Sequence, residues 1–243
     1  MVRAKVSVVT IIEEQMRKLG KKSRAANSQK FFKTGKGGYG EGDVFLGITM
    51  PEIRTVAREH LHIELKSVEQ LLKSPLHEIR MLAAVILTDC AKKAKTDKEK
   101  KLLYDCYMTN RAHINNWDLV DVSAPEVVGG YLVDKDRSIL HELARSESLW
   151  DRRIAVLATF RFIKTADFDD SIKLAEALLE DKHDLIHKAI GWMLREIGKK
   201  HMATAELFVS THCDTMPRTM LRYAIERYPE AKRKRYLNSI RNK

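Results

Sequence analysis

Hydrophobic residues recur along most of the chain with the spacing of an amphipathic helix, and few segments alternate hydrophobic and polar residues at every second position. The helical spacing i, i+3, i+4 and i+7 is seen in 53–61, 68–72, 79–87 and 172–179. Three prolines stand where such a pattern begins, a place that suits proline: Pro51, Pro75 and Pro217. The chain is therefore predicted to be all-α.

Four of the predicted helices share a local pattern. A charged residue, called the key position below, is followed three residues later by a small residue. The pairs are Arg80/Ala83, Asp121/Ala124, Arg152/Ala155 and Lys188/Gly191. Successive key positions are 41, 31 and 36 residues apart, which predicts a HEAT/armadillo-like solenoid of stacked helix pairs. Small residues at a constant helical position would let neighbouring helices approach closely. A non-repetitive helical bundle is the alternative.

One glycine-rich segment interrupts the helical pattern. The stretch 33–43, KTGKGGYGEGD, contains five glycines and is predicted to be a loop within a single domain spanning 1–243. Its GxGxxG spacing neither follows a predicted strand nor opens a helix, so it does not indicate a dinucleotide site. For the glycines we favour a flexible connector. For Tyr39 we favour a contact with nucleic acid, since Lys33 and Lys36 lie close by.

Charge narrows the choice of partner. Lys and Arg number 44 against 33 for Asp and Glu, which leaves a net charge of +11. This excess favours a polyanion, with nucleic acid ahead of a membrane surface or an acidic protein. No hydrophobic run approaches the ~18 residues of a membrane span, and no secretory cleavage pattern is evident.

The three cysteines, Cys90, Cys106 and Cys213, lack zinc-site or redox spacing, so a reducing compartment is expected. The expected location is the cytoplasm or the nucleoid. His183 and His187 stand at i and i+4 but without the glutamate of HExxH. We interpret them as solvent-facing and predict no metal site.

The chain has only three tryptophans, and each is interpreted differently. Trp150 is expected in the core. Trp192 lies four residues after Lys188 and three before Arg195, so one helical stripe would carry an indole between two cations. Such a stripe suits a surface on which nucleic acid stacks.

Trp117 and Asp121 lie one helical turn apart and are predicted to be side-chain neighbours. Asp121 is also the one acid among the key positions of the repeats. One reaction that would use an aromatic ring and a carboxylate beside nucleic acid is cleavage of an N-glycosidic bond. It leaves an oxocarbenium-like sugar, which a nearby carboxylate stabilises while it orients water. Asp118 is interpreted as a solvent-facing or capping acid.

Four motifs together resemble the AlkD family of bacterial DNA alkylation repair glycosylases: NNWDLVDVSAP, LWDRRIAVLATF, IHKAIGWMLREIGK and FLGITMPEIR. The resemblance runs in order from about Asp43 to Tyr228. It implies a HEAT-like solenoid with a basic concave DNA-binding face. It also implies excision of cationic bases such as 3-methyladenine and 7-methylguanine, with no metal or cofactor.

The resemblance assigns roles to individual positions. Trp117 and Asp121 match the family's WxxxD active-site pair, and Trp192 matches its second active-site tryptophan. Arg153 matches the arginine that contacts the DNA backbone, whereas the repeat pattern favoured Arg152. Tyr39 is the nearest counterpart of the family's N-terminal helical tyrosine, although it lies in the predicted loop. The predicted DNA-binding set is Tyr39, Arg152, Arg153, Lys188 and Arg195.

The sequence therefore predicts a monofunctional glycosylase that removes N3- and N7-alkylated purines from double-stranded DNA. It would act as a monomer and hydrolyse the N-glycosidic bond, and the resemblance implies that the lesion stays stacked instead of being flipped out. Asp121 would stabilise the oxocarbenium ion, while Trp117 and Trp192 hold the sugar. The alternatives are a non-catalytic helical-repeat DNA-binding protein of the same fold and a repeat scaffold for an acidic protein.

Overall fold

A computed structural model describes residues 6–239. Within that range every regular element is a helix, and the single β-pairing is an isolated bridge between Val44 and Leu76. The all-α prediction is confirmed. The chain divides into two compact units, residues 1–123 and 124–243, and each is described by itself. None of the described helices combines the length and hydrophobicity needed to cross a membrane.

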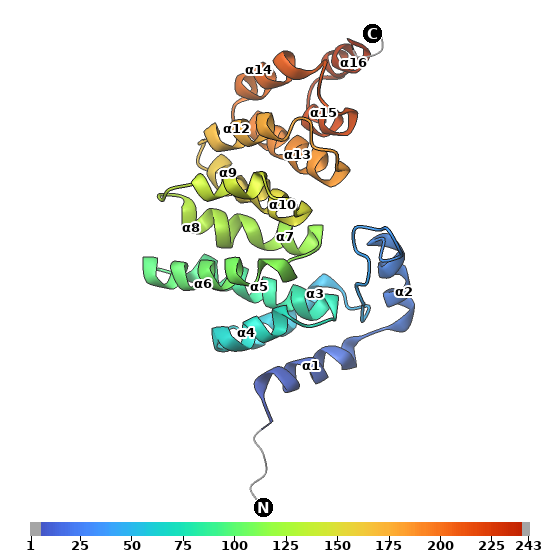
Figure 1. The fold of residues 1–243 in the computed structure, drawn as a ribbon, viewed down its shortest axis with the longest axis vertical. Coiled ribbons are helices and arrows are strands. Elements are labelled where there is room, and N and C mark those ends of the chain that lie inside the picture. Colours follow the sequence, from blue (N-terminus) through green and yellow to red (C-terminus); the bar gives the residue numbers. More distant parts are fainter. Residues whose placement is uncertain (1–5, 240–243) are drawn as a thin grey trace, which may run out of the picture. The chain divides into compact units, whose positions relative to one another are not determined.

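Unit 1 is built around a central helix, α5, whose residues from His77 to Thr88 are all buried. The elements of this unit are α1 (Val8–Leu19), α2 (Lys22–Phe31), α3 (Met50–Glu59), α4 (Leu65–Leu72), α5 (His77–Lys93), α6 (Asp97–Thr109), the 3-10 turn η1 (Arg111–His113) and α7 (Trp117–Ala124). Helices α3, α4 and α6 pack against α5 (Figure 1). In contrast, α2 buries none of its residues.

Unit 2 is built around α10 and α13, which pack against each other. Its elements are the π-helical turn η2 (Pro125–Gly129), α8 (Gly130–Leu132), α9 (Ser138–Ala144), α10 (Leu149–Ala158), α11 (Phe160–Ile163), α12 (Asp169–Ala177), α13 (Asp184–Lys200), α14 (Met202–His212), α15 (Arg218–Ala224) and α16 (Glu230–Ser239). Helices α14 and α15 pack on α13, and α9 packs on α10.

The prolines begin helices as predicted. Pro51 lies in the first turn of α3, where the backbone N–H of Thr49 donates to the Glu52 carboxylate at 2.7 Å. Pro217 immediately precedes α15, and Pro75 comes two residues before α5. Proline suits these positions because a backbone N–H in the first turn would have no partner within the helix, so its absence costs nothing there.

The four key positions of the repeat pattern fall on four helices, α5, α7, α10 and α13. Their small partners are buried in each case: Ala83, Ala124, Ala155 and Gly191. At Gly191 an added Cβ would lie 2.5 Å from Tyr223 Cβ and 2.6 Å from the Met220 carbonyl oxygen. A glycine here therefore lets α13 and α15 approach closely, as the sequence pattern indicates.

Replacement of Gly191 by alanine is expected to lower the free energy of unfolding by about 1–3 kcal/mol, because the added methyl group overlaps backbone. Gly198 on the same helix is the matched control, since its added Cβ would lie 3.4 Å from Ala205 Cβ, an ordinary contact. Gly198→Ala should be neutral or stabilise by up to about 1 kcal/mol through helix propensity. Urea denaturation of both variants measures the difference, and equal stabilities would contradict the packing role of Gly191.

The glycine-rich segment 33–43 is a loop, as predicted, and it folds back on itself. The Gly42 N–H donates to the Thr34 carbonyl at 3.3 Å, and the Gly37 N–H donates to the Glu41 carboxylate at 2.8 Å. Gly40 is buried, and a Cβ there would lie 2.5 Å from the Phe32 carbonyl oxygen. At Gly40 the glycine is thus explained by close packing, where the sequence favoured a flexible connector.

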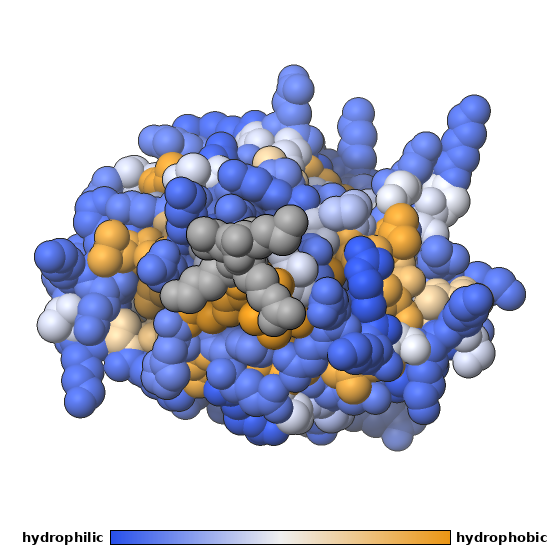
Figure 2. All heavy atoms as spheres, turned by 90° about the horizontal axis from the view of Figure 1, so that it is seen from below, coloured by the Kyte–Doolittle hydropathy of each residue, from blue (hydrophilic) through white to orange (hydrophobic). Residues whose placement is uncertain are grey.

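On the face shown in Figure 2, hydrophilic residues form most of the surface and hydrophobic residues occur as separate patches. The three cysteines are free thiols.

Candidate active site and nucleic-acid interface

Trp117 and Asp121 lie on α7, one turn apart, and both side chains are half-buried. The helix begins at Trp117 because the fully buried Asn116 caps it: the Trp117 backbone N–H donates to Asn116 Oδ1 at 2.8 Å. The prediction that Trp117 and Asp121 lie one turn apart on the same helix is confirmed.

Aromatic rings from the N-terminal part of unit 1 surround Trp117. Phe32 stacks on the indole with ring centroids 5.3 Å apart, and Phe31 meets it edge-on at 6.0 Å. The indole Nε1–H donates to the Tyr39 hydroxyl at 3.3 Å. The end of α2 and the loop 33–43 are therefore part of the candidate site. Phe31 remains 65% exposed, which leaves an accessible aromatic surface beside Trp117.

Asp118 faces the protein and is only 18% exposed. Its Oδ2 lies 2.9 Å from His77 Nε2, and its Oδ1 accepts the Leu119 backbone N–H at 2.9 Å. The expectation of a solvent-facing acid is wrong, because the buried imidazole on α5 draws this carboxylate inward. The hydrogen bond to Leu119 lies in the first turn of α7, which is consistent with the other interpretation of Asp118, a capping acid.

A second carboxylate binds the other side of the His77 ring. Asp43 Oδ2 lies 2.9 Å from His77 Nδ1, and Arg80 donates to both Asp43 and the Ser74 carbonyl. Burial alone would raise the pKa of Asp43, but the His77 hydrogen bond and the Arg80 charge outweigh it and lower that pKa. Arg80, a key basic residue of the repeat pattern, is thus part of a buried ion pair.

Two of the three arginines predicted to bind DNA, Arg152 and Arg153, contact protein groups in unit 2. Arg152 Nε donates to Asp181 Oδ2 at 2.7 Å, and its side chain is 17% exposed. Arg153 is buried and donates to the Leu185 carbonyl at the start of α13. Arg153 therefore links α10 to the first turn of α13 (Asp184–Lys200).

Acidic residues accompany the predicted cationic stripe on α13. Trp192 Nε1 donates to Glu196 at 3.1 Å, and Arg195 forms an ion pair with Glu226. Lys188 is paired with Asp184 at 2.7 Å and is the most exposed of the predicted cations in this unit, at 38%. The indole between two cations is present as predicted, but carboxylates share the surface.

The whole arrangement falls within a recognised sequence family. The family model for the DNA alkylation repair enzyme matches residues 12–228. The chain belongs to the DNA alkylation repair enzyme family. It follows that the protein has a role in DNA alkylation repair, and DNA is the partner that this role implies.

A solved structure supports the fold. The predicted DNA alkylation repair enzyme from Enterococcus faecalis superimposes with a TM-score of 0.65, covering 87% of this chain and 97% of that chain at 17% identity. At that identity the likeness concerns the fold alone, and it agrees with the helical-repeat prediction. No curated protein matches the sequence.

Two other sequence-based interpretations need correction in this family member. Trp150 is half-buried and lies outside the core in which it was expected. His183 and His187 are also half-buried. His183 caps α13 by accepting the Leu185 N–H at 3.1 Å, and His187 Nε2 bonds to the Asp181 carbonyl oxygen. Among residues 6–239 no group of three or more His, Cys, Asp or Glu could hold a metal ion.

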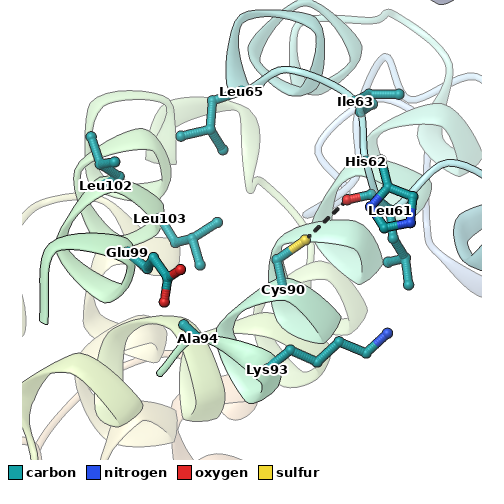
Figure 3. Close-up of a pocket in the computed structure, with 10 residues that line it drawn as sticks. All are labelled: Leu61, His62, Ile63, Leu65, Cys90, Lys93, Ala94, Glu99, Leu102 and Leu103. Atoms are coloured by element: carbon teal, nitrogen blue, oxygen red, sulfur yellow. Dashed lines mark hydrogen bonds between the residues drawn. The ribbon is translucent and has the colours of Figure 1, made fainter. Parts of the chain in front are cut away.

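A cavity of about 350 Å³ lies elsewhere in unit 1, between α5, α6 and the connection from α3 to α4 (Figure 3). Four of its ten lining residues are leucines, and the Cys90 thiol donates to the Leu61 carbonyl at 3.6 Å. Burial raises the pKa of Cys90, which makes this thiol a poor nucleophile. None of the predicted site residues lines the cavity, so it is separate from the candidate site.

The sequence missed Phe31, Phe32 and His77 as parts of the site. The adjacent phenylalanines precede the glycine-rich loop, and a hydrophobic pair beside a polar helix was the one available signal. His77 gave no signal, since its partners lie 34 and 41 residues away in the chain.

Proposed function

We propose that this protein is a DNA glycosylase that excises positively charged N3- and N7-alkylated purines from duplex DNA. The observation that carries the proposal is the pairing of Trp117 and Asp121 one turn apart on α7, in a chain of the DNA alkylation repair enzyme family. The reaction is hydrolysis of the N-glycosidic bond, with the lesion left in the base stack and without a cofactor.

The chemistry fits a site with one carboxylate. An alkylated purine carrying a positive charge is already a good leaving group, so its departure needs no general acid, unlike the leaving group of ordinary glycosidases. Asp121 stabilises the oxocarbenium ion that remains and orients the attacking water. Trp117, with the exposed ring of Phe31 beside it, offers an aromatic surface to the sugar and the cationic base.

The net charge of +11 supports binding to a polyanion. The proposed DNA-binding residues are Arg152, Arg153, Lys188 and Arg195 in unit 2 and Tyr39 in unit 1. Trp192 is proposed as the second active-site tryptophan. Lys188 is assigned a direct phosphate contact because it is the most exposed of the cations. Arg153 also holds the start of α13 through the Leu185 carbonyl, so its loss should weaken DNA binding partly through that helix.

The test is release of free 7-methylguanine from methylated duplex DNA, followed by chromatography with mass detection. We expect release together with a matching number of alkali-labile abasic sites, and no release from unmethylated DNA. Salt-dependent binding without base release would instead support the non-catalytic DNA-binding alternative. The absence of both base release and salt-dependent DNA binding would support the repeat scaffold for an acidic protein.

A further inference from the structure

A row of stacked rings connects the buried His77 with Trp117. The His77 and Phe45 centroids are 4.3 Å apart, those of Phe45 and Phe32 are 4.9 Å apart, and those of Phe32 and Trp117 are 5.3 Å apart. The interplanar angles along this row are 22°, 20° and 19°, so the rings lie nearly parallel. A displacement of the His77 ring would therefore be passed to the indole by direct contact.

Hydrogen bonds also connect His77 with the first turn of α7, which contains Trp117. On one side, His77 Nε2 lies 2.9 Å from Asp118, the residue after Trp117. On the other side, His77 Nδ1 lies 2.9 Å from Asp43, which accepts from Asn116 at 3.2 Å. Asn116 in turn caps Trp117. The imidazole is thus connected to the residues on both sides of Trp117.

The two carboxylates determine the protonation of the ring. A neutral imidazole has one N–H, so only the imidazolium form donates to Asp43 and Asp118 together. Burial lowers the pKa of His77, but the hydrogen bonds to Asp118 and Asp43 outweigh it and raise that pKa to about 9. Arg80, the other charge beside this group, is bound to Asp43.

We propose that His77 is a positioning residue for the repair site, holding the first turn of α7 and the Trp117 indole in place through both its hydrogen bonds and its ring. It touches neither DNA nor the reacting atoms. The catalytic consequence rests on the proposed function, whereas the placement of Trp117 can be measured without it.

The first experiment measures the environment of Trp117 by fluorescence. In a Trp150→Phe/Trp192→Phe background Trp117 is the sole indole of the chain. His77→Gln should shift the Trp117 emission to longer wavelength and increase its quenching by acrylamide. The matched control is Asp89→Asn on the same helix, which removes the carboxylate that pairs with Lys92 near the C-terminal end of α5, whereas His77 is the first residue of that helix. This control should leave the emission unchanged.

The second experiment follows the same emission against pH. Below His77's ordinary pKa of 6.5 the ring is protonated in both folded and unfolded chains, so its contribution to stability is complete. That contribution falls as pH rises toward 9 and is lost above it, where the ring can donate to only one carboxylate. We expect a change in Trp117 emission centred near pH 9 in the folded protein and none in His77→Gln.

The third experiment is kinetic and uses the otherwise unchanged chain. His77→Gln should lower kcat for base release by about 10- to 100-fold, as expected for a small misplacement of reacting groups, with KM changed far less. Asp89→Asn should retain kcat. If the unaltered protein releases no base, the proposed function fails, while the two fluorescence experiments still decide the role of His77.

Two results would overturn the proposal. One is a folded His77→Gln protein whose Trp117 emission and quenching match those of the unaltered protein. The other is the absence of any emission change between pH 7 and pH 10 while the protein stays folded. If His77→Gln does not fold, Asp118→Asn replaces it, since the amide keeps an acceptor for His77 but removes the charge. Asp118→Asn should then show the same emission shift, and its absence overturns the proposal.

Discussion

Replacement of Asp121 by asparagine is expected to slow release of 7-methylguanine by about 100- to 1,000-fold, the usual effect of removing one preorganised electrostatic group. The amide is nearly isosteric with the carboxylate but carries no charge to stabilise the oxocarbenium ion. Since DNA affinity comes mainly from cations and phosphates, binding to the methylated duplex should be retained. Single-turnover base release and a binding titration on the same duplex measure the two quantities.

Asp105→Asn is the matched control for this substitution. Asp105 is on α6 of the same unit, is 48% exposed and pairs with Lys101, so the variant removes one negative charge away from α7. It should release base at the rate of the unaltered protein. Equal rates for Asp121→Asn and the unaltered protein would show that Asp121 is not the catalytic carboxylate.

Replacement of Asp43 by alanine is expected to lower the free energy of unfolding by about 3–5 kcal/mol, the range for removing one member of a buried ion pair. Asp43 binds His77, Arg80 and Asn116, and only 9% of the residue is exposed. Its loss leaves the Arg80 guanidinium buried without its carboxylate. It also removes one of the two acceptors of the His77 ring.

Chemical denaturation at pH 7 measures this loss. The exposed pair of Lys101 and Asp105 supplies the comparison, because removing a surface ion pair changes stability by about 0–1 kcal/mol. Asp105→Ala should therefore be nearly as stable as the unaltered protein. If Asp43→Ala were equally stable, the buried network would not stabilise unit 1.

Hydrophobic spacing was sufficient to predict the helices and the pair on α7. The reason is that both are local: a side chain at i+4 is a neighbour of the one at i in any α-helix. The small residues of the repeat pattern were equally readable, and Gly191 shows their use, since its position admits the backbone of α15. Proline positions marked the starts of α3 and α15 for the same local reason.

The surroundings of α7 were not predictable in this way. Tyr39 and Trp117 are 78 residues apart in the chain, and nothing in their local sequences indicates that the hydroxyl meets the indole. Asp118 was expected to face solvent or to cap the helix, because an acid on a helix is usually exposed to water. Its partner His77 lies 41 residues away, and only the packing of α5 against the start of α7 reveals the pairing.

The environment of the cations in unit 2 also could not be predicted from the sequence. The net charge of +11 predicted a nucleic-acid partner, but the sequence could not show which cations of unit 2 are bound to other groups of the protein. Arg153 holds the Leu185 carbonyl and Arg152 binds Asp181, whereas Lys188 keeps the most exposed side chain of the predicted cations in this unit. The net charge can be counted from the sequence. The exposure of each cation depends on which groups the fold brings within hydrogen-bonding distance of it.

The sequence by itself determined the all-α class, the repeat positions and the Trp117–Asp121 pair, because these follow from periodicities of a few residues. Only the tertiary structure decided that Phe31, Phe32 and Tyr39 line the indole and that His77 lies between two carboxylates. Those contacts join segments far apart in the chain, and they form because burial of rings and of paired charges is favourable only when the whole unit is packed.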